Sequence, residues 1–271
     1  MPLRLNTSMM SLQALMGVDQ NKTQLQKSLA RMASGQRLNS ASDGAAELSQ
    51  AIKMQSEQLS NMAAQRNTHD GLSMVQTAEG ATGQAGEMLS RMRELSVQAA
   101  SETINDEQRG MIQTEITSIQ AEMDRIAGVT EFNGVQVANG TSPAIKVQVG
   151  TGGDSEDTID VELADLRADS LGVGSSSVNV ATAGGATSAL DAIDTAMDNL
   201  NGHRAKYGAA HNRLSSSVNQ LEIGFQASVE AESRIMDTDY AFESAETAKS
   251  QMLMDMGLAA AGQANRINQS T

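Results

Sequence analysis

Hydrophobic side chains follow a helical spacing most clearly between Leu190 and Ile235. They recur at alternating steps of three and four residues, which is the spacing of a helix that packs along another helix. The positions of this seam are Leu190, Ile193, Met197, Leu200, Arg204, Tyr207, His211, Leu214, Val218, Leu221, Phe225, Ser228, Glu232 and Ile235. At ~1.5 Å per residue such a helix is on the order of 70 Å long, which is too long for the core of a compact domain. The seam therefore predicts a long helix with a helical partner elsewhere in the chain.

Two helices with a connector between them are expected in the first hundred residues. The first helix spans Leu3–Met32, and its apolar positions are Leu5, Met9, Leu12, Met16, Leu25, Leu29 and Met32. A polar gap weakens this stripe, so we expect the helix to become ordered when it meets a partner. The connector Ala33–Gly44 is made of small and turn-forming residues that break a helix. The second helix runs from Ala45 to about Ala100.

The apolar stripe of the second helix changes phase at its glycines. One change falls at Asp70-Gly71, and another falls around Gly80, Gly83 and Gly86. A phase change of this kind indicates either a bend or a close contact with another helix.

A third helix follows, with Asn105 or Asp106 as its N-cap. Its apolar seam is regular and comprises Ile112, Ile116, Ile119, Met123 and Ile126. Two antiparallel helices joined by the turn Ser101–Asn105 would present facing stripes. They supply the partner that the C-terminal seam requires.

The hydrophobic period changes from helical to alternating after Gly128, which predicts three short strands. Their apolar positions are Val135 and Val137, then Ile145, Val147 and Val149, then Ile159, Val161 and Leu163. The segment Leu171–Gly185 is rich in Gly, Ser and Val and returns the chain to the long helix. The order predicts a small β-hairpin region against a helical rod.

A break at Met236–Asp239 precedes the last helix, which runs from Tyr240 to about Ile267. One side of this helix carries small and flexible apolar residues, namely Ala241, Ala245, Ala248, Met252, Met256 and Ala259 or Ala260. Small residues permit close helix approach. We therefore expect the two terminal helices to pair with each other and with neighbouring copies.

The predicted fold class is mainly α: a long antiparallel helical coiled-coil rod with a small β-hairpin region, and N- and C-terminal helices that pair as a coiled coil. We expect four parts. Residues 1–42 form the N-terminal helix and connector, 43–185 the two long helices and the hairpin region, 186–236 the long C-terminal helix, and 237–271 the terminal helix.

Composition narrows the classes of partner. The formal net charge is -14, which repels nucleic acid phosphates and anionic lipid, so we expect neither nucleic acid nor membrane as a partner. No apolar run approaches the ~18 residues of a membrane span, and the N-terminus lacks the apolar block of a secretory signal. The chain has no cysteine and no tryptophan. It therefore has no disulfide and no thiolate metal site.

No catalytic constellation is visible, and we expect neither a catalytic residue, nor a cofactor, nor a metal site, and no enzyme activity. His69, His203 and His211 have no metal-ligand spacing, and Ser40, Ser42 and Asp43 lack a nearby histidine. The acidic run Gly152–Asp160 has a faint likeness to a calcium loop. It lacks the terminal bidentate Glu of such loops, and a solvated turn between strands is the better interpretation.

Long ordered segments at both ends resemble the bacterial flagellins. The resembling segments are Leu29–Asp43, Asp70–Gly80, Arg91–Ala99, Asp124–Ala127, Thr130–Gly134, Ala189–Asp194, Ser233–Ile235, Asp237, Asp239 and Gln263–Asn265. The resemblance implies a structural subunit of the flagellar filament, which polymerises into a helical tube that acts as a propeller. The terminal helices would line the filament core, and the long helices with the hairpin would form the outer tube. The alternative is a flagellin-like protein of the hook–filament junction or cap.

The resemblance also implies partners. They are further copies of the chain, an export chaperone and the flagellar secretion apparatus, junction and cap proteins, and a host innate-immune receptor. That receptor contact would lie at Arg91, Leu95 and Glu115, and the alternative is that these residues make contacts between subunits. Ser90 stands where many recognised flagellins carry a glutamine.

The resemblance further implies a minimal flagellin. Only Leu171–Gly185 occupies the place of the variable outer domain. The chain reads Arg266–Thr271 where most flagellins close with a proline-containing apolar tail, and Ala261 stands where a larger apolar residue is common. We therefore expect a less tightly packed terminal-helix core, or compensation by Met252, Met254 and Met256, which can fill irregular gaps.

Overall fold

The computed structural model describes residues 9–269. They form two compact units: one comprises the chain up to Gln58 together with the chain from Gln226 onward, and the other comprises Leu59–Phe225. Residues 3–8 of the predicted first helix lie outside the described residues.

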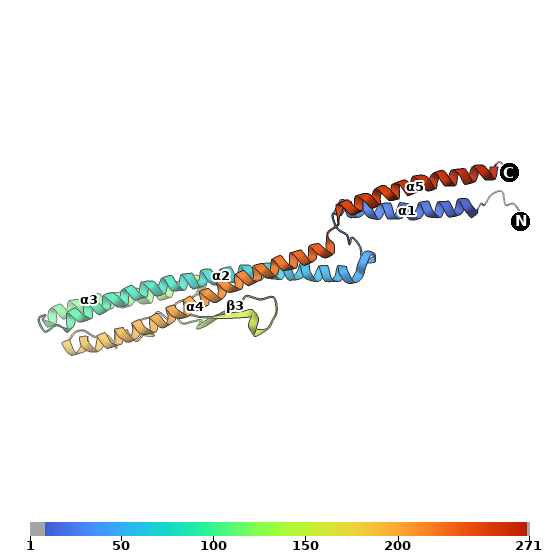
Figure 1. The fold of residues 1–271 in the computed structure, drawn as a ribbon. Coiled ribbons are helices and arrows are strands. Elements are labelled where there is room, and N and C mark those ends of the chain that lie inside the picture. The colour runs from blue at the N-terminus through green and yellow to red at the C-terminus, as the bar shows by residue number, and fades with distance from the viewer. Residues whose placement is uncertain (1–8, 270–271) are drawn as a thin grey trace. The chain divides into compact units, whose positions relative to one another are not determined.

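Five long helices and two small hairpins make up the described chain (Figure 1). In order they are α1 (Met9–Ser34), α2 (Ala41–Ala100), α3 (Asp106–Val129), β1 (Glu131–Phe132), β2 (Val135–Gln136), β3 (Ala144–Gln148), the 3-10 turn η1 (Ser155–Asp157), β4 (Thr158–Glu162), α4 (Ala183–Met236) and α5 (Tyr240–Gln269). The fold-class prediction is confirmed: the chain is mainly helical, carries a β-hairpin region, and pairs its terminal helices α1 and α5.

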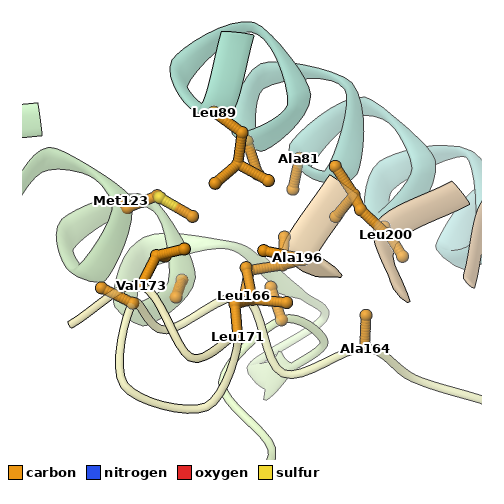
Figure 2. Close-up of a cluster of buried hydrophobic side chains, with 14 of the residues drawn as sticks. Ala81, Leu89, Met123, Ala164, Leu166, Leu171, Val173, Ala196 and Leu200 are labelled. Carbon is orange, nitrogen blue, oxygen red and sulfur yellow. The ribbon is translucent and has the colours of Figure 1, made fainter. Parts of the chain in front are cut away.

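The core of the unit Leu59–Phe225 lies where α2, α3 and α4 meet the loop that follows β4. Figure 2 shows Leu89 of α2, Met123 of α3 and Leu200 of α4 directed toward one another and toward the loop residues Leu171 and Val173. All five are at most 7% exposed. Many other core residues are alanines, so the helix axes can lie close together and a core with few aromatic side chains still excludes water.

The seam of α4 is buried at every second predicted position from Ile193 to Leu214 and is half-buried at Leu221, Ser228 and Ile235. Ile193, Leu200, Tyr207 and Leu214 are at most 3% exposed, whereas Arg204 of the same seam is exposed. The Tyr207 hydroxyl accepts a hydrogen bond of 2.8 Å from the backbone N–H of Ala164, and its burial raises the pKa of this phenol. The buried positions of the seam therefore belong to the core of this unit, and Tyr207 also holds the loop after β4.

The turn between α2 and α3 is closed by side chains. Asn105 is the N-cap of α3, and it forms a capping box in which its side chain accepts from the Gln108 N–H at 2.8 Å. The buried Arg109 side chain donates to the backbone carbonyls of Ala99 and Ser101 at 3.0 and 2.9 Å, at the C-terminal end of α2. Asn105 is thus the cap of the two candidates, and Arg109 satisfies carbonyls that a helix end leaves free.

The phase changes in α2 do not mark bends, which was one of the two interpretations that the sequence left open. The helix is continuous from Ala41 to Ala100 apart from the extended backbone of Gly44, and neither Gly71 nor the Gly80–Gly86 stretch departs from helical geometry. The apolar positions shift around the helix there because different elements pack against α2 along its length: β3 at Gly71 and α4 at Gly86.

The alternative interpretation, a close contact with another helix, holds at Gly86, whereas Gly71 admits a strand. A Cβ placed on Gly71 would lie 2.9 Å from Val147 Cγ1 on β3, and one on Gly86 would lie 3.3 Å from Leu200 Cδ2 on α4. Both glycines therefore let a neighbouring element approach the helix backbone.

The β region has one strand more than predicted. β1 and β2 form a two-residue hairpin closed by Asn133 and Gly134, which have φ of 50° and 78°. Two positive φ values in a row belong to a type I′ turn, for which Asn-Gly is a strong sequence signal. The second hairpin pairs β3 with β4 in the register Ile145↔Val161 and Val147↔Ile159.

The predicted return segment Leu171–Gly185 is packed. Val173, Val178 and Val180 are 0% exposed. Gln120 of α3 donates to the Val173 carbonyl at 2.7 Å, and Gln113 accepts from the Val180 N–H at 2.7 Å. Two glutamines of α3 thus hold this segment through its backbone.

The Gly71 contact generates a paired prediction. Gly71→Ala places a methyl group against the stiff Val147 side chain and lowers the free energy of unfolding by about 1–3 kcal/mol through overpacking. Gly80→Ala on the same helix meets no heavy atom within 4 Å and raises it by about 0.5–1 kcal/mol through helix propensity. Chemical denaturation of both variants checks this, and equal effects of the two substitutions would show that β3 does not pack against Gly71.

Asp165 fixes the loop after β4 and generates a pH prediction. Its carboxylate accepts from the Arg167 guanidinium at 2.6 Å and from Ser170 Oγ at 2.6 Å, and the Arg167 contact lowers the pKa of Asp165 to about 2. A lowered pKa stabilises the fold above the unfolded value of ~3.9, and this contribution disappears as the pH falls through the folded value.

Asp165→Asn therefore lowers the thermal midpoint at pH 6 by about 2–4 °C for a loss of about 1 kcal/mol. The difference from the parent shrinks between pH 4 and pH 2. Asp154→Asn is the control, because the Asp154 side chain makes no capping hydrogen bond. Scanning calorimetry across this pH range measures both, and a difference that stays constant with pH contradicts the assignment.

Candidate functional site

The two connectors at the ends of α1 and α4 pair with each other. The Arg37 N–H donates to the Met236 carbonyl at 2.6 Å, and the Thr238 N–H donates to the Gly35 carbonyl at 3.1 Å. The Arg37 guanidinium also donates to the Ile235 carbonyl at 2.9 and 3.2 Å. Both predicted helix breaks therefore form one joint, in which Arg37 satisfies carbonyls at the C-terminal end of α4.

The terminal helices α1 and α5 lie side by side from this joint outward (Figure 1). Their facing positions repeat at steps of three and four residues. On α1 they are Ala14, Val18, Asn21, Leu25, Ser28 and Met32, and on α5 they are Glu243, Thr247, Ser250, Met254, Gly257, Ala261 and Ala264. This spacing is that of a coiled coil, so the predicted pairing of the two helices is confirmed.

The apolar residues that the sequence suggests for this pairing face outward instead. Ala241, Ala245 and Ala248 are exposed, and so are Met252 and Met256, at 61% and 68%. They lie on the side of α5 opposite α1. The side that meets α1 is mostly small or polar. Of the three predicted compensating methionines, Met254 alone enters the seam, while Ala261 is buried in it.

The outward surface of the helix pair is therefore rich in large hydrophobic side chains. On α1 the exposed ones are Met9, Leu12, Leu15, Met16 and Leu29, and on α5 they are Tyr240, Phe242, Met252, Leu253, Met256 and Leu258. We call these residues the outward apolar surface. Large apolar side chains that are exposed together on one helix pair are candidates for an interaction site.

The three predicted site residues lie together on α2 and α3, but only two are accessible. Arg91 donates to Glu115 Oε1 from Nη2 at 2.7 Å and from Nε at 3.1 Å, and it also contacts Glu94. Glu115 and then Glu94 raise the pKa of Arg91. Leu95 is 2% exposed and belongs to the core. A partner at this surface would meet the ion pair rather than the leucine.

The other polar candidates are parts of the scaffold. His203 has a buried Nδ1 without a hydrogen-bond partner in the described part of the chain, and desolvation lowers its pKa. His69 is exposed and His211 is half-buried. The Asp157 carboxylate lies against Gly150 and Gly152 in the turn before β4. Among residues 9–269, no helix is long and apolar enough to span a membrane, and no three His, Asp or Glu side chains are grouped as metal ligands.

Two family models match the chain. One describes the bacterial flagellin N-terminal helical region and matches residues 5–142, and the other describes the bacterial flagellin C-terminal helical region and matches residues 190–271. The chain is 32% identical to a flagellin of Bacillus subtilis, with 97% of both chains covered. It is 33% identical to a flagellar filament 30.7 kDa core protein of Treponema maltophilum, with 96% and 94% covered.

A solved structure gives the same result. The crystal structure of Bacillus cereus flagellin is 31% identical to this chain, covers 58% of it and 88% of the crystal chain, and has a TM-score of 0.51. At this identity and coverage the likeness concerns fold and sequence together.

The different burial of Leu95 and Arg91 generates a prediction. Leu95→Ala removes a core side chain and lowers the free energy of unfolding by about 2–5 kcal/mol. Arg91→Gln removes an exposed ion pair and changes it by at most about 1 kcal/mol. Urea denaturation of the two variants measures both effects. A small cost for Leu95→Ala would mean that the leucine is not packed as described and is free to meet a partner.

Proposed function

The chain belongs to the bacterial flagellin family and is a structural subunit of the extracellular flagellar filament, and we propose that α1 and α5 form the inner layer of that filament. In this arrangement the outward apolar surface of each helix pair packs against the helix pairs of further copies. Residues 1–42 and 237–271 belong to this inner layer. Residues 43–185 and 186–236 form the outer tube.

The observation that carries the proposal is the outward apolar surface. Met16, Phe242, Met256 and Leu258 are 63% to 68% exposed, and full burial of one such side chain contributes roughly 1.5–3 kcal/mol. Contacts between different surfaces of identical subunits generate rings where the rotation closes and helical filaments where it does not. Burial of this surface between copies thus supplies a driving force for polymerisation.

The unit Leu59–Phe225 suits an outer tube. It has its own buried core of α2, α3, α4 and the hairpins, so it needs no further copy to exclude water from that core. The flagellins are structural proteins, and we assign no catalytic role to the chain.

The same surfaces define the further partners in this proposal. An export chaperone covers the outward apolar surface of α5 before polymerisation, because exposed apolar helices aggregate. The secretion apparatus then exports the chain, and junction and cap proteins contact the helix pairs at the two ends of the filament. The exposed pair Arg91–Glu115 is the part of the predicted receptor contact that an innate-immune receptor could reach.

Charge insertion on the outward apolar surface tests the proposal. Met256→Glu introduces a carboxylate where a further copy packs, and burial of an unpaired charge reduces the yield of polymer by more than about tenfold. Gln251→Glu adds the same charge at an exposed polar position of α5 and is the matched control. Salt-induced polymerisation on short filament seeds, followed by sedimentation and electron microscopy, measures the yield.

Circular dichroism of both variants verifies that the monomer keeps its helices. Normal polymerisation of Met256→Glu with a folded monomer would show that this residue does not pack against further copies. In that case the inner-layer assignment of the outward apolar surface would be wrong.

A further inference from the structure

The seam between α1 and α5 is unusually polar for a coiled coil. Ser28, Glu243 and Ser250 are at most 5% exposed, whereas large apolar side chains point away from the seam. Apolar seams stabilise helix pairs most, and a polar residue at a seam position lowers stability while it selects one register. The polar positions of this seam are therefore candidates for a function in specificity.

An ion pair crosses the seam close to the connector joint. Arg31 Nη1 donates to Glu243 Oε1 at 3.0 Å, and the two side chains are 24% and 6% exposed. Within the described residues, Glu243 Oε2 and the hydroxyls of Ser28 and Thr247 are buried without a hydrogen-bond partner. Burial of these groups costs stability, and removal of one charge would leave the other buried and unpaired.

The register of the two antiparallel helices follows from two contacts. Besides Arg31 and Glu243, Val18 Cγ2 lies 2.8 Å from the position of a Cβ on Gly257. Val18 precedes Arg31 by 13 residues, and Gly257 follows Glu243 by 14. The helices therefore stay in one register along this length, and that register sets Ser28 opposite Thr247.

Packing alone discriminates weakly between this register and its neighbours. Most facing positions are small or polar, so a shift of one heptad, ~10.5 Å along the helix, brings similar side chains together. With the shift that sets Leu25 opposite Glu243, the carboxylate would be buried against an apolar side chain and lose its guanidinium. The Arg31–Glu243 ion pair thus distinguishes the observed register from the shifted one, which the shapes of the small side chains do not.

We propose that the Arg31–Glu243 ion pair selects the register of α1 against α5, and so determines which side chains of the two helices form one outward apolar surface. The second clause rests on the proposed inner-layer role, and the first does not. Register selection by the paired connectors alone, through the backbone bonds of Gly35, Arg37, Met236 and Thr238, is the competing explanation.

Disulfide formation between introduced cysteines measures the register, because the chain has no native cysteine. Ser28→Cys with Thr247→Cys reports the observed register, and Asn21→Cys with Thr247→Cys reports the one-heptad shift that sets Leu25 opposite Glu243. A disulfide requires Cβ atoms about 3.5–4.5 Å apart, much less than one heptad. The ratio of the two cross-links is read by mass spectrometry on the full chain, both dispersed and after polymerisation.

We expect the first cross-link to dominate in the parent and the ratio to fall about tenfold or more in Glu243→Gln and in Arg31→Glu. The charge-swapped double variant Arg31→Glu with Glu243→Arg restores it. Lys249→Gln removes the Lys249–Glu246 pair, and it leaves the ratio within about twofold because Lys249 is 62% exposed and the pair lies within α5 rather than across the seam.

An unchanged ratio in both single variants overturns the proposal and assigns the register to the connectors. A parent in which the two cross-links are equally frequent overturns it as well. If the single variants do not fold, the swapped variant decides, since failure to recover the dominant cross-link counts against the ion pair. A variant that loses the dominant cross-link but still polymerises normally counts against the inner-layer role alone.

Discussion

A long helix withdraws only one narrow stripe of its surface from water, and this constraint governs the whole chain. In the unit Leu59–Phe225 the stripes of α2, α3 and α4 face one another, and the hairpins and the loop after β4 complete the enclosure. The terminal helices have a single described partner each, so one stripe is covered and the rest of their apolar surface is not. One unit is therefore complete within a single copy, and the other keeps apolar surface that further copies cover in our proposal.

The two helix pairings differ in what they place in the seam. Around α4 the seam is apolar and tight, with Ile193, Leu200 and Leu214 fully enclosed. Between α1 and α5 the seam is small and polar, with Ser28 and Glu243 enclosed instead. The apolar seam maximises the stability of the helix pairing. The polar seam selects one register of the two helices at a cost in stability. This distribution is consistent with a filament subunit whose ends gain most of their stability from neighbouring copies.

Periodicity predicted the elements whose signal is local. The α4 seam, the Asn105 cap and the pairing of the terminal helices follow from spacing and capping chemistry, and the comparisons confirm the flagellin resemblance. The sequence left both a bend and a close contact open in α2, because a glycine that bends a helix and one that admits Val147 look alike in sequence. The side of α5 that faces α1 was missed because apolar spacing alone does not distinguish a partner in the same chain from one in another copy. The strand β1 was missed although Asn133-Gly134 carried its signal.

The burial of Tyr207 gives the molecule a built-in optical label. The chain has no tryptophan and only two tyrosines. Tyr207 is enclosed in the core of the unit Leu59–Phe225, where its hydroxyl accepts from the Ala164 N–H, whereas Tyr240 is 61% exposed at the start of α5. The near-ultraviolet signal of the native protein therefore separates into one ring in a fixed asymmetric environment and one in solvent. A change in the environment of α5 is therefore measurable at Tyr240 against the constant background of Tyr207, without any added fluorophore.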